Sequence, residues 1–122
     1  MRKLQLDWQG YYPFDERSIR GKVQDDSGIY KISREQKDGA LKPVFVGQAK
    51  SIRLRLLEKL TTDGDTCLKE QAGKGGCMFR FAYLYTQEEM DAAERALYKR
   101  YVPKCNDPAS VPEAEDVEVN TN

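Results

Sequence analysis

The sequence predicts a single α+β domain, in which helices flank a small three-stranded sheet of mixed or antiparallel strands. The first indication is three short apolar runs that alternate like strands, and the second is two longer segments with apolar residues at helical spacing. The third is the length of 122 residues, which allows one hydrophobic core but not two. Hydrophobic residues make up 39% of the chain, and no apolar run approaches the ~20 residues of a membrane span.

Residues 1–26 are expected to form an N-terminal arm that packs on the domain. This arm is rich in aromatic residues and should be irregular or partly stranded, covering part of the core through Trp8, Tyr11, Tyr12 and Phe14. The first residues are basic but include no continuous apolar segment of the kind found in secretion signals. A cytoplasmic location is therefore expected.

The first two strands are predicted on either side of a turn-rich loop. Residues 28–33 (G-I-Y-K-I-S) alternate in hydrophobicity, and residues 44–47 (V-F-V-G) form a second apolar run. Gly39 and Pro43 interrupt the segment between them, which is typical of a hairpin loop. We therefore expect the two strands to pair antiparallel.

A helix is predicted over residues 49–60, because its apolar residues form one stripe at Ile52, Leu56, Leu57 and Leu60. Residues 61–77 are polar and glycine-rich, with a short helix expected over 66–72. The G-K-G-G run there lacks the upstream Gly and the trailing Ser or Thr of a phosphate-binding P-loop, which excludes nucleotide binding by that route.

The third strand and the last helix follow directly. Residues 78–86 alternate and are rich in aromatic side chains, as in a strand. Thr86 with Glu89 three residues later has the spacing of a capping box, which predicts a helix from there to Tyr101, ended by Pro103.

The charge is unevenly distributed although the whole chain is neutral. Residues 107–122 contain five acids and no base, and this polar segment is expected to be a disordered tail. Residues 1–106 therefore carry 20 bases against 15 acids, a net +5 that suits contact with phosphates.

Cys67, Cys77 and Cys105 are expected to be reduced thiols. Their number is odd, no two of them have C-x-x-C spacing, and the chain contains no His. This pattern argues against both a disulfide and a structural zinc site.

Three separated motifs resemble the GIY-YIG nuclease domain over residues 27–106. They are G-I-Y at residues 28–30, V-F-V-G at 44–47, and the pattern E-x-x-L-x-x-x-Y-x-P-x-x-N from Glu94 to Asn106. The segment after Gly47, G-x-A-K-x-I-x-x-R-L, is most similar to the N-terminal catalytic domain of the bacterial excision-repair nuclease. The resemblance implies an endonuclease that hydrolyses phosphodiester bonds of nucleic acid, expected to be DNA, with Mg²⁺ or Mn²⁺.

The resemblance also implies roles for individual residues. Tyr30 would help to activate the attacking water, Arg55 would bind the phosphate and stabilise the transition state, and Glu94 would be the metal ligand. Supporting roles fall to Phe45, Gly47 and Asn106, and nucleic-acid contacts to Lys50, Arg53 and Lys59. A glycine at position 47 would allow a positive φ angle or the close approach of a phosphate.

Two positions depart from the family pattern. Phe45 keeps the aromatic ring of the second motif but lacks its hydroxyl group, and Lys59 stands where many members carry His or Tyr. Two alternatives therefore remain open: a catalytically degenerate module that binds nucleic acid or a protein partner, and an unrelated small α+β interaction domain. No separate DNA-binding motif is visible, so specificity would come from the structure of the substrate, from a homodimer or from a partner protein; no membrane partner is expected.

Overall fold

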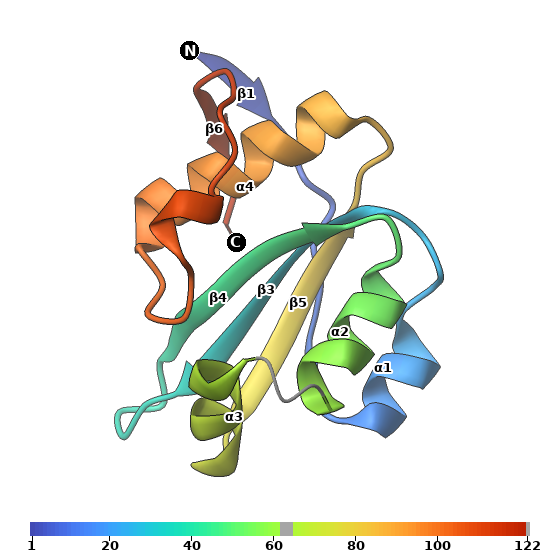
Figure 1. Ribbon diagram of the computed structural model, residues 1–122, viewed down its shortest axis with the longest axis vertical. Coiled ribbons are helices and arrows are strands. Elements are labelled where there is room, and N and C mark those ends of the chain that lie inside the picture. Colours follow the sequence, from blue (N-terminus) through green and yellow to red (C-terminus); the bar gives the residue numbers. More distant parts are fainter. Residues whose placement is uncertain (62–64, 122) are drawn as a thin grey trace.

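The computed structural model describes residues 1–61 and 65–121, and its centre is a four-stranded antiparallel sheet with helices on both faces (Figure 1). The strands lie in the order β2–β5–β3–β4 and comprise β2 (Gln9–Pro13), β3 (Gly28–Glu35), β4 (Leu41–Ala49) and β5 (Cys77–Tyr83). The predicted α+β class is confirmed, and β2 adds a fourth strand to the predicted three. The first two predicted strands, β3 and β4, pair antiparallel as expected.

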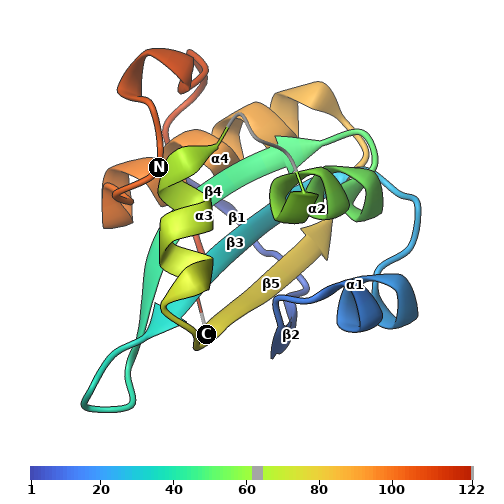
Figure 2. The same cartoon turned by 60° about the horizontal axis from the view of Figure 1, so that its bottom comes forward.

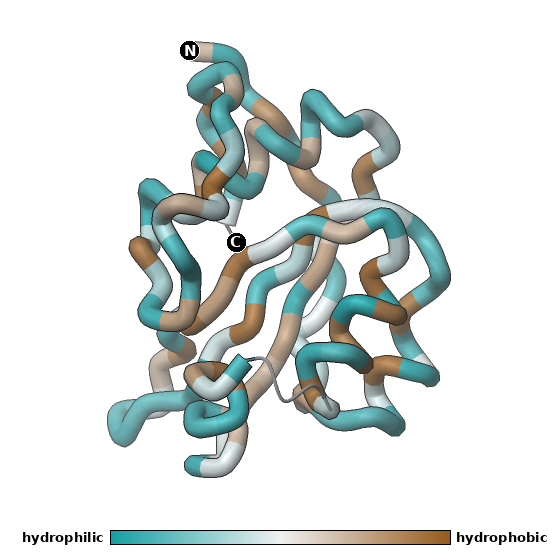
Figure 3. Tube along the Cα trace, in the orientation of Figure 1, coloured by the Kyte–Doolittle hydropathy of each residue, from teal (hydrophilic) through white to brown (hydrophobic). Residues whose placement is uncertain are grey.

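Two layers of helices cover the sheet. Helices α1 (Glu16–Lys22), α2 (Ile52–Thr61) and α3 (Thr66–Gly73) lie on one face, and α4 (Gln87–Tyr101) lies on the other (Figure 2). Each layer has its own core cluster, with helix residues Ile19, Ile52, Leu56 and Leu68 on the first face and Met90, Ala93 and Leu97 on the second. Hydrophobic residues line the central strands, whereas the β3–β4 hairpin loop is hydrophilic (Figure 3).

The helix boundaries follow from local chemistry. The Thr86 hydroxyl group accepts a hydrogen bond from the Glu89 N–H at 3.2 Å, which caps α4 as predicted. Val102 then adopts a left-handed conformation with φ 42°, and Pro103 follows it. Helices α2 and α3 lie within a few residues of their predicted ranges.

The N-terminal arm is more regular than expected. It contains β2, which pairs with β5, and the short helix α1, where the Asp15 carboxylate accepts a hydrogen bond from the Ser18 N–H at 2.7 Å. Trp8, Tyr12 and Phe14 pack against the core as predicted. A helix of seven residues with one buried apolar side chain, Ile19, is too short to give a clear periodic pattern.

The expectation of a disordered tail is wrong for residues 107–121. They contain a 3₁₀ turn, η1 (Pro108–Ser110), and a strand, β6 (Val117–Val119), which pairs parallel with β1 (Arg2–Leu4). Val117 and Val119 are buried beneath α4. Two alternating valines are enough to bury a short strand, although the acidic composition of the tail as a whole is typical of disorder. The division of the chain at residues 26 and 106 stays a prediction.

The expectation that all the cysteines are reduced is also wrong. Cys67 in α3 and Cys105 after α4 form a disulfide with a Cα–Cα distance of 5.4 Å, while Cys77 is free and half-buried. The two bonded residues are 38 positions apart, and their proximity results from packing that their spacing does not reveal. Among the described residues, no helix has both the length and the apolar character needed to cross a bilayer.

Candidate active site

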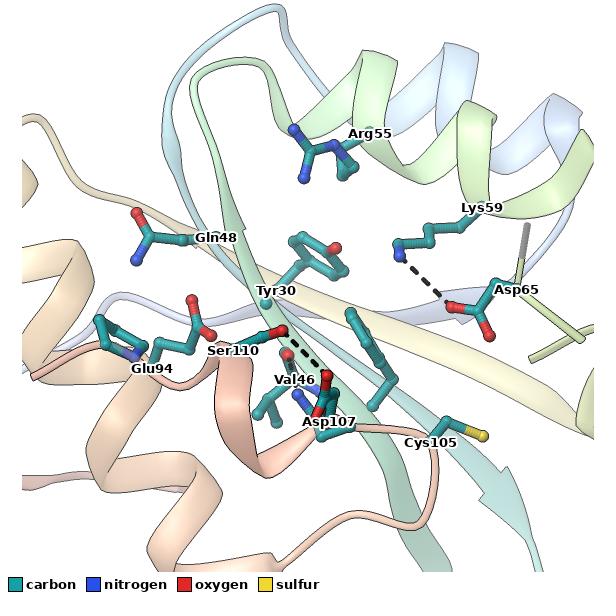
Figure 4. A pocket seen from close by; sticks show the side chains of 14 residues that line it. Tyr30, Val46, Gln48, Arg55, Lys59, Asp65, Glu94, Cys105, Asp107 and Ser110 are labelled. Carbon is teal, nitrogen blue, oxygen red and sulfur yellow. Dashed lines mark hydrogen bonds and ion pairs between the residues drawn. The ribbon is translucent and has the colours of Figure 1, made fainter. Parts of the chain in front are cut away.

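A cleft of about 510 Å³ opens along β4, the edge strand of the sheet, between α2, α4 and the segment that follows α4 (Figure 4). Seven of the predicted site residues line it: Tyr30, Phe45, Gly47, Arg55, Lys59, Glu94 and Asn106. The other lining residues are ones to which the motifs assigned no role: Val46, Gln48, Asp65, Cys105, Asp107, Ser110 and Pro112.

Tyr30 lies on the central strand β3 directly opposite Gly47 of β4. A Cβ atom at position 47 would lie 2.6 Å from the Tyr30 hydroxyl oxygen and 2.7 Å from its Cζ atom. The φ angle of Gly47 is not positive. The glycine is therefore required by the close approach of the Tyr30 ring, rather than by the backbone conformation that the sequence suggested.

Burial governs the protonation of Tyr30. The side chain is 1% exposed, and burial raises the pKa of its phenol above the ordinary value of 10.0. The charge of Arg55 opposes this increase in pKa, while the charges of Glu94 and Asp65 add to it. Tyr30 therefore keeps its proton at neutral pH, and Arg55 is the residue that favours its removal.

Arg55 projects into the cleft from α2. Its Nε atom lies 3.4 Å from a carboxylate oxygen of Glu58, and nearly half of the Arg55 side chain is exposed. The guanidinium group therefore lies on the same cleft as the buried phenol of Tyr30 and remains accessible from solvent (Figure 4). An exposed pair of this kind is weak, so Glu58 does not hold the guanidinium group firmly.

Glu94 faces the same cleft from the middle of α4 and is 8% exposed. Burial raises the pKa of its carboxyl group above the ordinary value; the polar side chain of Gln48 opposes the increase in pKa, and the charge of Asp91 adds to it. Gln48 also donates a hydrogen bond to Asp91 at 2.7 Å. Within the described residues, Glu94 has no basic side chain as an ion-pair partner.

Asn106 joins the segment after α4 to the free edge of the sheet. Its amide oxygen accepts from the Val46 N–H at 2.9 Å, and its amide nitrogen donates to the Val46 carbonyl at 2.8 Å. The N–H of Cys105 donates to the Val44 carbonyl at 2.9 Å. Asn106 thus satisfies the backbone N–H and carbonyl groups of Val46 on the edge strand where it borders the cleft, and its supporting role in the site stays a prediction.

Lys59 lies at the other end of the cleft, on the face of α2 that also carries Arg55. Its ammonium group is 4.5 Å from the centre of the Phe45 ring and 3.3 Å from a carboxylate oxygen of Asp65. The Phe45 ring in turn stacks on the ring of Tyr30, with their centres 6.0 Å apart.

The structure does not bring Lys50 and Arg53 into the cleft. Lys50 is exposed beside a neighbouring shallow hollow that Leu54 and Arg55 also line. The Nε atom of Arg53 donates to the Val23 carbonyl at 2.7 Å and so ties α2 to the end of α1. The predicted nucleic-acid contacts of both residues stay predictions.

The donor set suits a divalent cation of the Mg²⁺ type. Among the described residues, no group of three or more His, Cys, Asp or Glu side chains could enclose a metal ion. Glu94 is a single buried carboxylate that faces a cleft with room for water. Mg²⁺ retains several waters and is commonly held by one or two carboxylates, so this arrangement fits it.

The fold matches that of known structures, whereas comparisons with protein-family models and with curated proteins find no match. The chain is similar to the GIY-YIG N-terminal endonuclease domain of UvrC from Thermotoga maritima bound to magnesium, with 22% identity and a TM-score of 0.59 over 74% of this chain and 97% of that one. A mutant of that domain with Asn replaced by Ala matches with a TM-score of 0.58 and 22% identity, over 74% and 96% of the two chains. A mutant with Tyr replaced by Phe matches with a TM-score of 0.56 and 25% identity, over 74% and 97%. The chain therefore has a GIY-YIG-like fold.

Proposed function

We propose that this chain, whose fold is that of a GIY-YIG domain, is a metal-dependent endonuclease that hydrolyses phosphodiester bonds, with DNA as its substrate. The observation that carries the proposal is the convergence of Tyr30, Arg55 and Glu94 on one cleft. They come from β3, α2 and α4 and supply a phenol, a guanidinium group and a carboxylate. Phosphodiester hydrolysis requires an oriented water, a phosphate-binding cation and a ligand for a metal.

Glu94 would hold the cation, either Mg²⁺ or Mn²⁺. Support comes from its burial without a basic partner among the described residues, since a buried carboxylate is stabilised by a positive charge. The UvrC domain with the same fold is bound to its catalytic divalent cation, magnesium. When bound, such a cation lowers the pKa of its water and neutralises charge on the phosphate. Gln48, whose polar side chain lowers the pKa of Glu94, would help to orient its carboxylate.

Arg55 would bind the phosphate, and Tyr30 would orient the attacking water. A guanidinium group can contact two phosphate oxygens at once, and that of Arg55 is accessible at the cleft. Tyr30 keeps its proton at neutral pH, so its hydroxyl group acts first as a hydrogen-bonding group that holds the water in place. The charge of Arg55 opposes the increase in the Tyr30 pKa and so favours the phenolate, which forms when the phenol releases its proton to solvent; only this phenolate could accept a proton from the attacking water and return to the neutral phenol.

A second candidate function is a catalytically degenerate module that binds nucleic acid or a protein partner. It is favoured by Phe45, which provides no hydroxyl group at the cleft, and by Lys59 in place of a neutral polar side chain. A homodimer or a partner protein that supplies specificity is compatible with either function.

A cytoplasmic location also stays a prediction. Disulfides are rare in the cytosol, so the redox state of Cys67 and Cys105 in cells bears directly on it.

The decisive experiment is cleavage of labelled plasmid, single-stranded DNA, branched DNA and RNA with Mg²⁺, Mn²⁺ or EDTA. Wild type should cut DNA only with a divalent cation, and Glu94→Ala should be inactive. Glu88→Ala is the matched control, because Glu88 lies on the same helix with 77% of its side chain exposed. Binding without cleavage by the wild type, unchanged in Glu94→Ala, would favour the degenerate module.

A further inference from the structure

We propose that Phe45, Lys59 and Asp65 act as one unit, in which Asp65 is a positioning residue that holds the Lys59 ammonium group over the Phe45 ring and toward the reacting phosphate. The inference rests on the proposed nuclease function. It adds Lys59 to Arg55 as a second positively charged side chain that would contact the phosphate. It also assigns a role to Asp65, which the sequence motifs did not indicate.

The two departures from the family pattern contact each other. The face of an aromatic ring carries partial negative charge and attracts an ammonium group within about 6 Å of its centre. Lys59 is 4.5 Å from the centre of the Phe45 ring. Phe45 therefore provides a platform for Lys59, and the loss of a hydroxyl group at one position is matched by the gain of a cation at the other.

Asp65 fixes the direction of the Lys59 side chain. One carboxylate oxygen of Asp65 accepts from the Leu68 N–H at 3.0 Å and caps α3, and the other lies 3.3 Å from the Lys59 ammonium group. Both side chains are largely buried, with exposed fractions of 19% for Lys59 and 17% for Asp65. A lysine has four flexible side-chain bonds, so a fixed carboxylate removes most of the alternative positions of its ammonium group.

Helix α3 is itself firmly attached beside the cleft. Leu68 is 1% exposed in the core, and Cys67 is bonded to Cys105 on the opposite wall. The carboxylate of Asp65 therefore caps a helix that is anchored both in the core and to the segment after α4.

The ammonium group of Lys59 is directed at the same ligand as Arg55. The two residues lie one helical turn apart on α2, and both side chains extend toward Tyr30 (Figure 4). The exposed part of Lys59 lies in the cleft, where a phosphate held by Arg55 would be within its reach. Two cations on one helical turn would share the negative charge that develops on the phosphate in the transition state.

Asp65→Asn tests the positioning role, because Asn also caps helices and so preserves the hydrogen bond to Leu68 while removing the charge. We expect kcat to fall by about tenfold or more, since small misplacements of a reacting group reduce rates by up to about 10²-fold. The KM for DNA should stay the same or decrease, because a negative charge leaves the cleft. Glu70→Gln is the control: it makes the same charge change at an exposed position of α3 and should leave both constants unchanged. An unchanged or increased kcat in Asp65→Asn would overturn the proposal.

A double-mutant cycle tests whether Asp65 acts through Lys59. Once Lys59→Met has removed the ammonium group, Asp65→Asn should have no further effect on kcat. A further decrease of kcat in the double variant would show that Asp65 acts by another route and would overturn the proposal.

A spectroscopic measurement separates failure of this inference from failure of the proposed function. Protons of the Lys59 ε-methylene group, held over the Phe45 ring, should be shifted upfield in the NMR spectrum by the ring current. The shift should decrease in Asp65→Asn and persist in Glu70→Gln, whether or not the protein cuts DNA. An inactive wild type would contradict the nuclease function alone, whereas an upfield shift retained in Asp65→Asn would contradict the positioning role alone.

Discussion

The Tyr30 side chain lies directly over Gly47, so closely that a methyl group at position 47 would lie 2.6 Å from the Tyr30 hydroxyl oxygen. The two residues are also paired across β3 and β4. The glycine of the second motif thus makes room for the tyrosine of the first motif, and their spatial contact explains why the domain needs both.

Gly47→Ala should destabilise the protein and displace Tyr30. The added carbon atom would overpack the buried ring, which typically costs about 1–3 kcal/mol in the free energy of unfolding. Urea denaturation measures this change, and DNA cleavage should fall with it. Gly21→Ala is the matched control, because nothing lies within 4 Å of the added carbon in α1 and alanine favours a helix. Equal stability of the Gly47→Ala variant and the wild type would contradict the close contact.

Tyr30→Phe should remove activity while leaving the fold intact. The ring still packs against Phe45, but the hydroxyl group that orients the water is lost, and we expect kcat to fall by roughly 10²–10⁴-fold. Tyr85→Phe removes a hydroxyl group at a side chain that is 71% exposed, and it should cut like the wild type. If Tyr30→Phe retained full activity with an unchanged melting temperature, Tyr30 would be a core residue only.

Lys31 should make the stability depend on pH above neutrality. It is 1% exposed, with its ammonium group 5.2 Å from the centre of the Trp8 ring and 5.1 Å from that of Tyr101. Burial lowers the pKa of Lys31 to about 8 from 10.5, and the charges of Arg80 and Arg100 contribute. Between these pH values the unfolded chain binds more protons than the folded one, so the free energy of unfolding should rise with pH.

Deprotonation of Lys31 should increase the free energy of unfolding by roughly 2–3 kcal/mol. This increase is absent below pH 8 and grows as the pH rises toward 10. Above pH 10 the raised pKa of Tyr30 acts in the opposite direction, because the folded state then holds the extra proton. Denaturation curves from pH 7 to 10 measure the effect. Lys31→Met should abolish the rise and increase stability at pH 7, whereas Lys37→Met, at an exposed loop position, should keep it. A flat profile for the wild type would contradict the burial of a charged lysine.

Reduction of the Cys67–Cys105 disulfide should weaken both stability and activity. A bond between residues 38 positions apart restricts the unfolded chain and typically contributes about 2–4 kcal/mol. The disulfide also joins α3, whose N-cap is Asp65, to the segment that contains Asn106. Both segments line the cleft, so we expect the cleft to become less rigid when the disulfide is reduced.

The measurement is thermal unfolding and DNA cleavage of Cys67→Ser/Cys105→Ser beside the wild type with and without reductant. Cys77→Ser, which leaves the bonded pair intact, is the control and should respond to reductant as the wild type does. A double variant as stable and active as the oxidised wild type would show that hydrogen bonds alone hold the two walls.

The elements that depend on near neighbours could be predicted from the sequence. Hydrophobic alternation indicated β3, β4 and β5, and the spacing of Thr86 and Glu89 indicated the start of α4, because these patterns involve residues only a few positions apart. The motif resemblance also named the phenol, guanidinium group and carboxylate that now line one cleft.

The contacts between distant segments depend on tertiary packing and could not be predicted from the sequence. The pairing of β1 with β6 and the Cys67–Cys105 disulfide join residues that no local pattern connects. The same holds for Gln48 beside Glu94, which the packing of α4 against β4 brings together. Asp65 is only six positions after Lys59, but the contact depends on how α3 is placed relative to α2, which no periodic pattern specifies. The packing of the hydrophobic faces of the elements decides which residues come together. A periodic pattern in the sequence specifies which face of an element is buried, but not which residues of two elements meet.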